Sequence, residues 1–349
     1  MVFVKASLNA NSQLLIRPLV SVIMPVKDAA DTVKTAIDSI INQTFRHFEF
    51  IIVNDGSTDR TAHILNTYED QRITIIHQDH SGIARSLNKA IKQSRSPFIA
   101  RMDADDIASP DRLALQYQFL QDHPEIGVVS SLVKFAGNIE KQKGYFLYCE
   151  WINSLRSSRE IYINRFVDSP IAHPTVMLRK EVMDKYGYYD ESELPEDYEL
   201  WLRLMHEGVK FSKIDRELLT WTDRTNRLSR THSNYGKNAF YKIKSKYLIC
   251  WIKKKFPDKL PKIWIWGWGK SVFQKSADLN DQLPISGYID VSTPPVPSQK
   301  RTVIHYSDIP PQGNVLILSY VGDRLGKSGI CQYLMARGYK AGIDFYMMA

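Results

Sequence analysis

Three aspartates, Asp103, Asp105 and Asp106, stand within four residues of one another, soon after the apolar run 97–100. The run predicts a short buried strand, so the carboxylates would follow its carboxyl end. Like charges this close repel one another, and a bound cation removes that cost. Carboxylate oxygens suit Mg²⁺ or Mn²⁺, ions that commonly also bind the phosphates of a substrate. The pattern predicts such a metal site or, as the alternative, an acidic turn before a helix that Ser109 would cap.

Alternating strands and helices would position these aspartates. Four apolar runs predict strands at 20–25, 48–53, 73–76 and 97–100. Helical patterns separate them, and this alternation predicts an α/β fold built from parallel β-α-β units with right-handed crossovers. Asp28, Asp55 and the Asp103 group each follow the carboxyl end of a predicted strand. Because open α/β sheets bind ligands at that edge, we expect a single active-site cleft there.

The motifs at these strand ends resemble glycosyltransferase family 2. The segments that carry the resemblance, in chain order, are 20–26, 53–59, 82–90 and 103–106. The resemblance covers about residues 18–235 and implies a GT-A fold, which is a Rossmann-like α/β domain with a mostly parallel central sheet. It also implies an enzyme that takes a sugar from a nucleoside-diphosphate sugar and passes it to a glycan, lipid-linked or protein-linked acceptor.

Position within the family motifs implies roles for the aspartates. Asp55 would accept a hydrogen bond from the base, most simply N3–H of uracil, which implies a UDP-sugar. Asp103 would hold the ribose, directly or through the metal, and Asp105 would coordinate Mg²⁺ or Mn²⁺ at the diphosphate. Such an ion would neutralise charge on the departing diphosphate. The further residues that the resemblance places at the donor are Pro25, Val26 and Asp28.

An acidic pair, Glu196 and Asp197, precedes an amphipathic helical pattern. Favourable charge at a helix N-terminus would explain the pair without chemistry. The pair also resembles the family's catalytic Glu-Asp motif, which implies an inverting transfer with Asp197 as general base and Glu196 orienting it or the acceptor. A base of this kind works best when partly desolvated, which nearby aromatic rings would provide. The candidate acceptor contacts are His173 and Trp201.

A basic segment at 221–230 closes the predicted transferase domain. Many relatives have a histidine here that completes metal binding, and Arg224 stands at the aligned position. Arg224 and Arg227, together with Arg230, would clamp a diphosphate through bidentate hydrogen bonds. A solvated basic loop is the equally open alternative.

The C-terminal third reads as a linker and a second domain. Lysines and aromatic residues alternate over 236–260, which predicts a helix that packs on its own protein or, alternatively, lies on a membrane surface. Residues 261–349 predict a small Rossmann-like domain, because a strand, a turn with Gly267 and Gly269, a helix and a second strand follow in order. The third glycine of a dinucleotide-binding turn is missing, since Val272 stands there, which disfavours an oxidoreductase. Some bacterial family 2 transferases and the vertebrate β-1,3-N-acetylglucosaminyltransferase-like group have a similar arrangement.

Composition limits the remaining possibilities. The chain has 349 residues and a net charge of +8, which permits an anionic partner, but no nucleic-acid module is recognisable. Three widely spaced cysteines favour a reduced cytoplasmic compartment, with a peripheral place at the inner membrane surface as an alternative. No apolar run reaches the roughly 20 residues of a membrane span. Residues 1–17 read as a leader without a cleavable signal pattern. A regulatory protein that binds a sugar nucleotide without transferring it is the alternative function.

Overall fold

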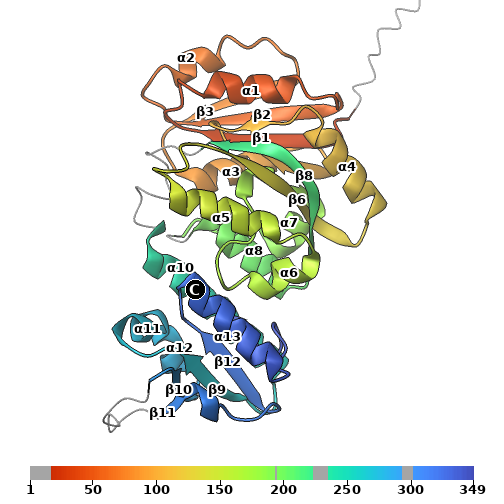
Figure 1. Ribbon diagram of the computed structural model, residues 1–349. Helices are drawn as coiled ribbons and strands as arrows, with labels where there is room; N and C mark the ends of the chain where they lie inside the picture. The colour runs from red at the N-terminus through yellow and green to blue at the C-terminus, as the bar shows by residue number, and fades with distance from the viewer. Residues whose placement is uncertain (1–16, 193–194, 223–234, 293–301) are drawn as a thin grey trace, which may run out of the picture.

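A computed structural model describes residues 17–192, 195–222, 235–292 and 302–349. Except for Arg17, the expected leader lies outside them. The chain forms a large and a small α/β unit, with helix α10 (Lys237–Lys255) between them (Figure 1). Each unit is built around its own sheet. The predicted α/β class is therefore confirmed, with a second and smaller sheet behind the first.

The large unit contains an eight-stranded sheet in the order β3-β2-β1-β4-β7-β6-β8-β5. Its strands are β1 (Val20–Val26), β2 (Phe48–Asp55), β3 (Ile73–Gln78), β4 (Phe98–Arg101), β5 (Ile107–Ala108), β6 (Ile126–Ala136), β7 (Met177–Arg179) and β8 (Lys210–Thr222). The four predicted strands pair in parallel, as expected, and β7 adds antiparallel to β4. The helical segments of the unit are α1 (Val33–Ile41), α2 (Thr61–Leu65), α3 (Ile83–Gln93), α4 (Arg112–Asp122), α5 (Lys143–Ser154), α6 (Ser158–Asn164), η1 (His173–Thr175), α7 (Lys180–Tyr186) and α8 (Glu196–His206).

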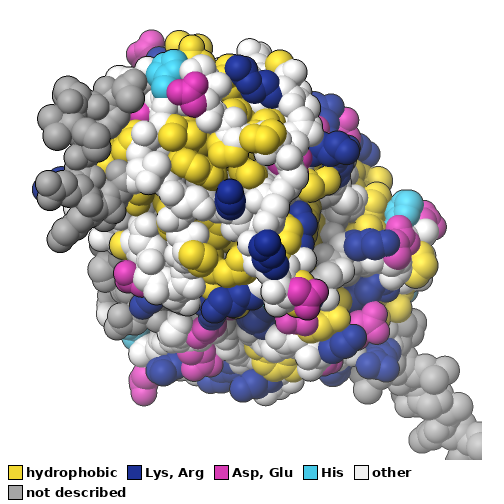
Figure 2. All heavy atoms as spheres, turned by 90° about the horizontal axis from the view of Figure 1, so that it is seen from below, with side chains coloured by type: hydrophobic (Ala, Val, Ile, Leu, Met, Phe, Trp, Pro, Cys, Tyr) yellow, Lys and Arg dark blue, Asp and Glu magenta, His cyan; other side chains and the backbone are white. Residues whose placement is uncertain are grey.

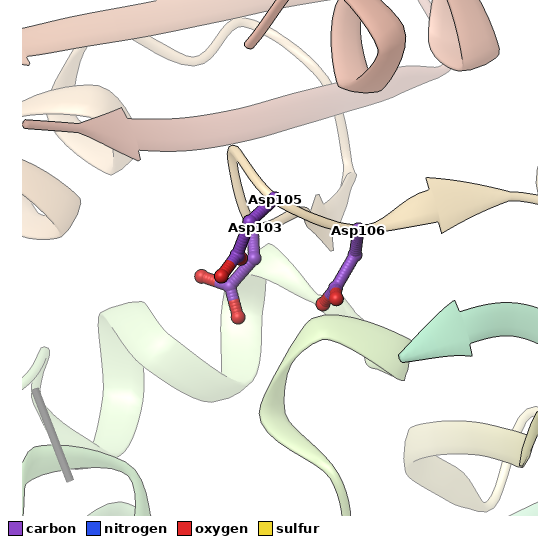
Figure 3. Close-up of side chains that lie close together, drawn as sticks. All are labelled: Asp103, Asp105 and Asp106. Atoms are coloured by element: carbon purple, nitrogen blue, oxygen red, sulfur yellow. The ribbon is translucent and has the colours of Figure 1, made fainter. Parts of the chain in front are cut away.

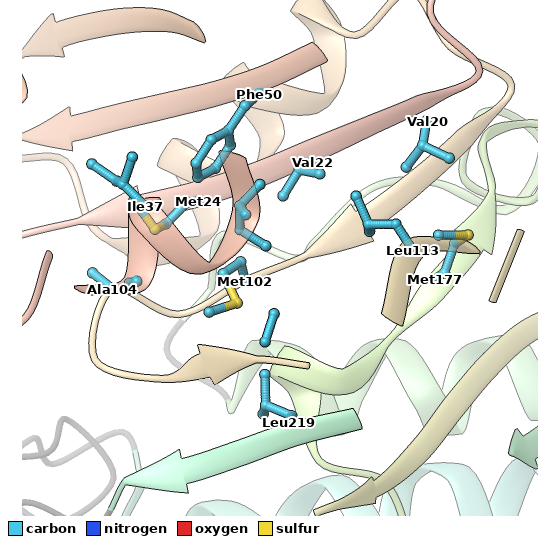
Figure 4. Close-up of a cluster of buried hydrophobic side chains, with 14 of the residues drawn as sticks. Val20, Val22, Met24, Ile37, Phe50, Met102, Ala104, Leu113, Met177 and Leu219 are labelled. Atoms are coloured by element: carbon cyan, nitrogen blue, oxygen red, sulfur yellow. The ribbon is translucent and has the colours of Figure 1, made fainter. Parts of the chain in front are cut away.

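Side chains alternate along each strand and so point to the two faces of this sheet in turn. Both faces are buried, each in its own hydrophobic cluster. Val22 and Met24 of β1 pack on one face with Ile37 of α1 and Phe50 of β2 (Figure 4). Ile23 points to the other face and belongs to a second cluster that includes residues of α3 and α8. The covered sheet fixes the positions of the strand ends, where the predicted site residues lie.

The small unit has five parallel strands in the order β11-β10-β9-β12-β13, which confirms a Rossmann-like arrangement. The strands are β9 (Lys262–Trp266), β10 (Ile285–Asp290), β11 (Val303–His305), β12 (Val315–Ser319) and β13 (Phe345–Met347). The helical segments are α11 (Lys270–Lys275), α12 (Ala277–Gln282), η3 (Tyr306–Asp308) and α13 (Arg324–Ala336). On the face shown in Figure 2, the described Lys and Arg side chains are scattered among other residues and form no single basic patch.

Helix α10 joins the two units through one hydrophobic cluster. Its buried residues Ile243, Leu248 and Ile252 share this cluster with residues of both units, such as Leu202 of α8 and Ile265 of β9. Much of the apolar face of α10 therefore packs on its own protein, which is the first of the two arrangements that the sequence left open. None of the helices in the described ranges is long and apolar enough to cross a bilayer.

Truncating the fully buried Leu248 tests whether this shared cluster stabilises the protein. We expect Leu248→Ala to lower the free energy of unfolding by about 2–5 kcal/mol, because it removes buried methyl groups and leaves a cavity. Leu325→Ala is the matched control, since the Leu325 side chain is 85% exposed. Urea unfolding followed by circular dichroism compares the two variants. Equal stabilities would contradict a cluster that joins both units.

Candidate active site

The aspartate loop follows β4 and brings the three carboxylates together. One oxygen from each of Asp103, Asp105 and Asp106 lies within 4.8 Å of the others. Figure 3 shows Asp103 and Asp105 side by side, with Asp106 set apart along the loop. Asp106 is fully buried and accepts a hydrogen bond of 2.9 Å from the backbone N–H of Thr222 at the end of β8. Asp106 therefore anchors the loop, and the two partly exposed carboxylates offer the oxygen ligands that a hard divalent cation prefers.

Two buried arginines support this loop from beneath. Arg101, the last residue of β4, forms an ion pair with Asp103. Arg112 of α4 has no exposed surface and donates a hydrogen bond of 2.6 Å to the carbonyl of Arg101. Burial, together with the nearby charge of Arg101, lowers the pKa of Arg112 to about 9. The sequence analysis missed both residues, although a charge such as Arg101 at the end of a buried strand is a signal in itself, because it needs a partner.

Asp55, at the end of β2, is almost completely buried. Its oxygens accept hydrogen bonds from Gln78 Nε2 at 2.8 Å, Ser81 N at 2.8 Å and Gly82 N at 2.9 Å, and one lies 2.8 Å from His80 Nδ1. Burial alone would raise the pKa of Asp55, but these hydrogen bonds outweigh it and hold the pKa well below the usual carboxyl range. Asp55 thus stays ionised and holds loop 80–82 in place. A nucleobase bound to Asp55 would approach the carboxylate beside this loop.

Asp28 connects two of the strand-end loops. Its φ of 47° lies in the left-handed region, which aspartate tolerates better than most residues. Its carboxylate accepts a hydrogen bond of 2.7 Å from the Thr58 N–H, and its own N–H donates to Ser57 Oγ at 3.0 Å. Of the other predicted donor residues, Val26 is buried and Pro25 is half-buried at the end of β1. The structure thus brings the strand ends of β1 and β2 together, as the sequence predicted.

The acidic pair occupies the first turn of α8. Glu196 is buried, its Oε2 accepts a hydrogen bond of 2.5 Å from the Tyr235 hydroxyl, and its Oε1 lies 3.9 Å from His173 Nδ1. Asp197 is partly exposed, and its Oδ1 accepts from the N–H of Tyr198 at 2.7 Å. Burial raises the pKa of both carboxyls, the charge of Asp197 raises that of Glu196 further, and the nearby Arg101 charge opposes both shifts. Asp197 is therefore the more exposed member of the pair.

The structure corrects the acceptor role predicted for Trp201. Its ring has no exposed surface, because it packs in the core against His173 and Phe211 at centroid distances of 5.7 and 5.9 Å. His173 is also buried, and its Nε2 lies 2.7 Å from the Tyr189 hydroxyl. Burial, and then the charge of Arg101, lowers the pKa of His173 well below its usual value, so the ring is neutral at pH 7. The His173 ring lies beside Glu196, and the Trp201 ring packs against His173.

Other site residues fall into two groups. Arg224, Arg227 and Arg230 lie outside the described residues. Tyr189 and Tyr235 contact the acidic pair or its histidine neighbour and were missed. Neither tyrosine stands in a motif, and Tyr235 lies 39 residues from Glu196, so no local pattern connects them.

Comparison with known proteins agrees with this geometry. Residues 21–187 match the model of Glycosyl transferase family 2. The uncharacterized glycosyltransferase MJ1057 of Methanocaldococcus jannaschii is 34% identical over 224 residues, which is 61% of this chain and 74% of the relative. The O-antigen biosynthesis glycosyltransferase WbnJ of Escherichia coli is 31% identical over 251 residues, which is 69% of this chain and 92% of the relative.

A solved structure shows the same fold. Residues 1–349 of S. aureus TarS, in complex with UDP-GlcNAc, overlap with a TM-score of 0.51 at 20% sequence identity. The overlap covers 69% of this chain and 73% of that chain. The GT-A fold that the sequence motifs implied is therefore confirmed. With relatives above 30% identity that it covers over most of their length, the chain belongs to glycosyltransferase family 2 and is a transferase enzyme.

Proposed function

We propose that the chain is an inverting, metal-dependent glycosyltransferase that moves a sugar from a nucleoside-diphosphate sugar to a hydroxyl of a glycan acceptor. One observation carries the proposal: Arg101 connects the two candidate metal ligands Asp103 and Asp105, called the metal-type carboxylates below, to the acidic pair. It forms an ion pair with Asp103, and its charge opposes the rise that burial causes in the pKa values of Glu196 and Asp197. Metal ligands and a general base therefore border the same buried charge, which is the arrangement that a transfer between donor and acceptor needs.

The donor side would be held by the strand ends. Asp103 and Asp105 would hold Mg²⁺ or Mn²⁺, and such an ion neutralises charge that develops on the departing diphosphate. Asp55 and Asp28 would border the nucleoside, with Arg224 and Arg227 as the candidate diphosphate clamp. Asp106 would keep its hydrogen bond to the backbone of β8 and so hold the aspartate loop in place.

The transfer itself would use the acidic pair. The acceptor oxygen forms a bond to the anomeric carbon while the bond from that carbon to the diphosphate oxygen breaks, and the electron pair leaves with the diphosphate. The acceptor proton passes to the Asp197 carboxylate, which is partly exposed and has a pKa raised by burial. A raised pKa makes a carboxylate a stronger base at neutral pH. Attack from the face opposite the leaving group inverts the anomeric configuration.

The comparisons suggest which substrates to test first. TarS is described in complex with UDP-GlcNAc, so UDP-sugars are the first donors. WbnJ is named for O-antigen biosynthesis, so bacterial surface glycans are the first acceptors. The alternative, a regulatory protein that binds a sugar nucleotide without chemistry, gives no reason for a buried carboxyl at Glu196 next to the partly exposed Asp197.

Product stereochemistry tests the proposal. The protein is incubated with Mn²⁺ and a panel of UDP- and GDP-sugars, with and without glycan acceptors, and proton NMR follows the anomeric signals. We expect nucleoside-diphosphate release and a product of inverted configuration, including slow transfer to water. Retained configuration would contradict the assignment of Asp197 as base. Donor binding without release in any mixture would favour the regulatory alternative.

The pH dependence of the rate tests the base separately. Asp197 must be unprotonated to accept a proton, and folding raises its pKa. Activity is therefore lost as the pH falls through a value above the roughly 3.9 of an ordinary aspartate. We expect the acid limb of kcat/KM to lie more than one pH unit above that value. A profile that stays flat down to about pH 4 would show that no buried carboxyl acts as the base.

A further inference from the structure

Helix α10 and Tyr235, two residues before its start, contact the first turn of α8 at three points. The Tyr235 hydroxyl donates to Glu196 Oε2 at 2.5 Å. The ring of Phe240 stacks on Tyr198 with 5.5 Å between the centroids. The Tyr247 hydroxyl donates to Glu199 Oε1. These contacts lie on both sides of Asp197 in the first turn of α8. They therefore fix the position of the turn that carries the acidic pair.

Glu199 connects α10 to the residues behind the acidic pair. It is 1% exposed, and its carboxylate accepts hydrogen bonds of 3.1 and 3.2 Å from Arg203 one turn later. Arg203 also donates to the carbonyl of Tyr188 at 2.6 Å, directly before Tyr189. The Tyr189 hydroxyl contacts His173, which lies beside Glu196. A series of contacts therefore leads from α10 through Glu199 and Arg203 to His173, whose Nδ1 lies 3.9 Å from Glu196 Oε1.

The small unit holds α10 in this position. The buried α10 residues pack against β9, α12 and β12 of the small unit in one cluster. Lys244 is buried, and its ammonium donates to the carbonyls of Val167 in the large unit at 2.5 Å and of Met348 in the small unit at 3.3 Å. A displacement of the small unit would move α10, and with it the groups that bind Glu196 and Glu199.

We infer that the small unit serves the reaction as a positioning element, acting through α10 on the catalytic helix. Tyr247 and Glu199 are the positioning residues of this connection. Neither borders the metal-type carboxylates, and both act on where Asp197 lies. This inference rests on the proposed function, since it assigns the small unit a role in the step that Asp197 performs. It predicts that loss of the connection lowers turnover and leaves donor binding intact.

Tyr247→Phe removes the hydroxyl and keeps the ring in the cluster. We expect kcat to fall by roughly 10-fold to 100-fold, because small misplacements of a catalytic group are costly. The donor dissociation constant, measured by calorimetry with Mn²⁺, should stay unchanged. Tyr339→Phe is the matched control, because Tyr339 is a buried tyrosine of the small unit that belongs to a different hydrophobic cluster and donates its hydroxyl hydrogen to the carbonyl of Pro310. We expect its kcat to equal that of the unmodified protein.

Glu199→Gln provides an independent second variant, and a double-mutant cycle with Tyr247→Phe tests whether the two residues act as one connection. Their combined loss of kcat should be smaller than the product of the two single losses if they share the hydrogen bond. Additive losses, or equal kcat in Tyr247→Phe and Tyr339→Phe, would overturn the inference. A parallel loss of donor binding would also overturn it. Absence of turnover in the unmodified protein would instead contradict the proposed function, so the two failures are distinguishable.

Discussion

Replacing Asp197 by asparagine is expected to lower kcat by roughly 100-fold to 10,000-fold, the usual contribution of a general base. Asparagine keeps the shape of the side chain but cannot accept the proton of an acceptor hydroxyl. The donor dissociation constant should not change, because the donor is assigned to the strand-end aspartates. Steady-state kinetics together with calorimetric titration of the donor nucleotide would separate the two effects. The acid limb of the pH profile should disappear with the base.

Glu207→Gln is the control for this substitution. Glu207 caps the other end of α8 and is exposed, so its loss of charge changes the helix without touching the acidic pair. Its kinetics should match those of the unmodified protein. Nearly full activity in Asp197→Asn would exclude Asp197 as the base. Glu196, whose buried carboxyl is hydrogen-bonded to Tyr235, would then be the next candidate base.

Replacing Asp105 by alanine is expected to abolish the part of donor binding that depends on Mn²⁺, because it removes a ligand oxygen from the cluster. The expected loss of affinity is on the order of 100-fold, by comparison with other changes at metal sites. Calorimetry with and without Mn²⁺ measures it directly. Thermal stability should be retained, since Asp105 is partly exposed on its loop.

Two further aspartates make the Asp105 result interpretable. Asp122→Ala, at the exposed end of α4, removes a charge far from the loop and should leave donor binding unchanged. Asp106→Ala should instead lower stability, because Asp106 is fully buried and holds the backbone of β8. Equal Mn²⁺ dependence in Asp105→Ala and the unmodified protein would exclude Asp105 as a ligand.

Local patterns were sufficient to predict the strands that carry the donor-side residues. The apolar runs before Asp28, Asp55 and Asp103 became β1, β2 and β4, because a sheet covered on both faces requires continuous apolar strands. Parallel pairing then brings their ends to one edge, which follows from topology alone. The second sheet was predicted in the same way, from a strand, a glycine turn and a helix.

Contacts between distant segments were beyond such patterns. Helical spacing puts Trp201 one turn after Asp197, and the sequence does not show that His173 and Phe211 cover its ring. Tyr235 meets Glu196, and Tyr247 meets Glu199, through the packing of α10 and the residues before it against α8. Likewise, the hydrogen bonds from loop 80–82 to Asp55 depend on how that loop folds back onto β2. These contacts depend on tertiary packing, which sequence spacing does not encode.

Calorimetric titration of UDP, with and without Mn²⁺, tests the central claim most directly, because the aspartate loop is assigned to hold a metal-bound nucleoside diphosphate. We expect binding that is strengthened by Mn²⁺ in the unmodified protein and loses this dependence in Asp105→Ala. Metal-dependent binding of GDP in place of UDP would keep the metal site and overturn the assignment of uracil to Asp55. Failure of every nucleoside diphosphate to bind, with Mn²⁺ present, would contradict the proposed donor site.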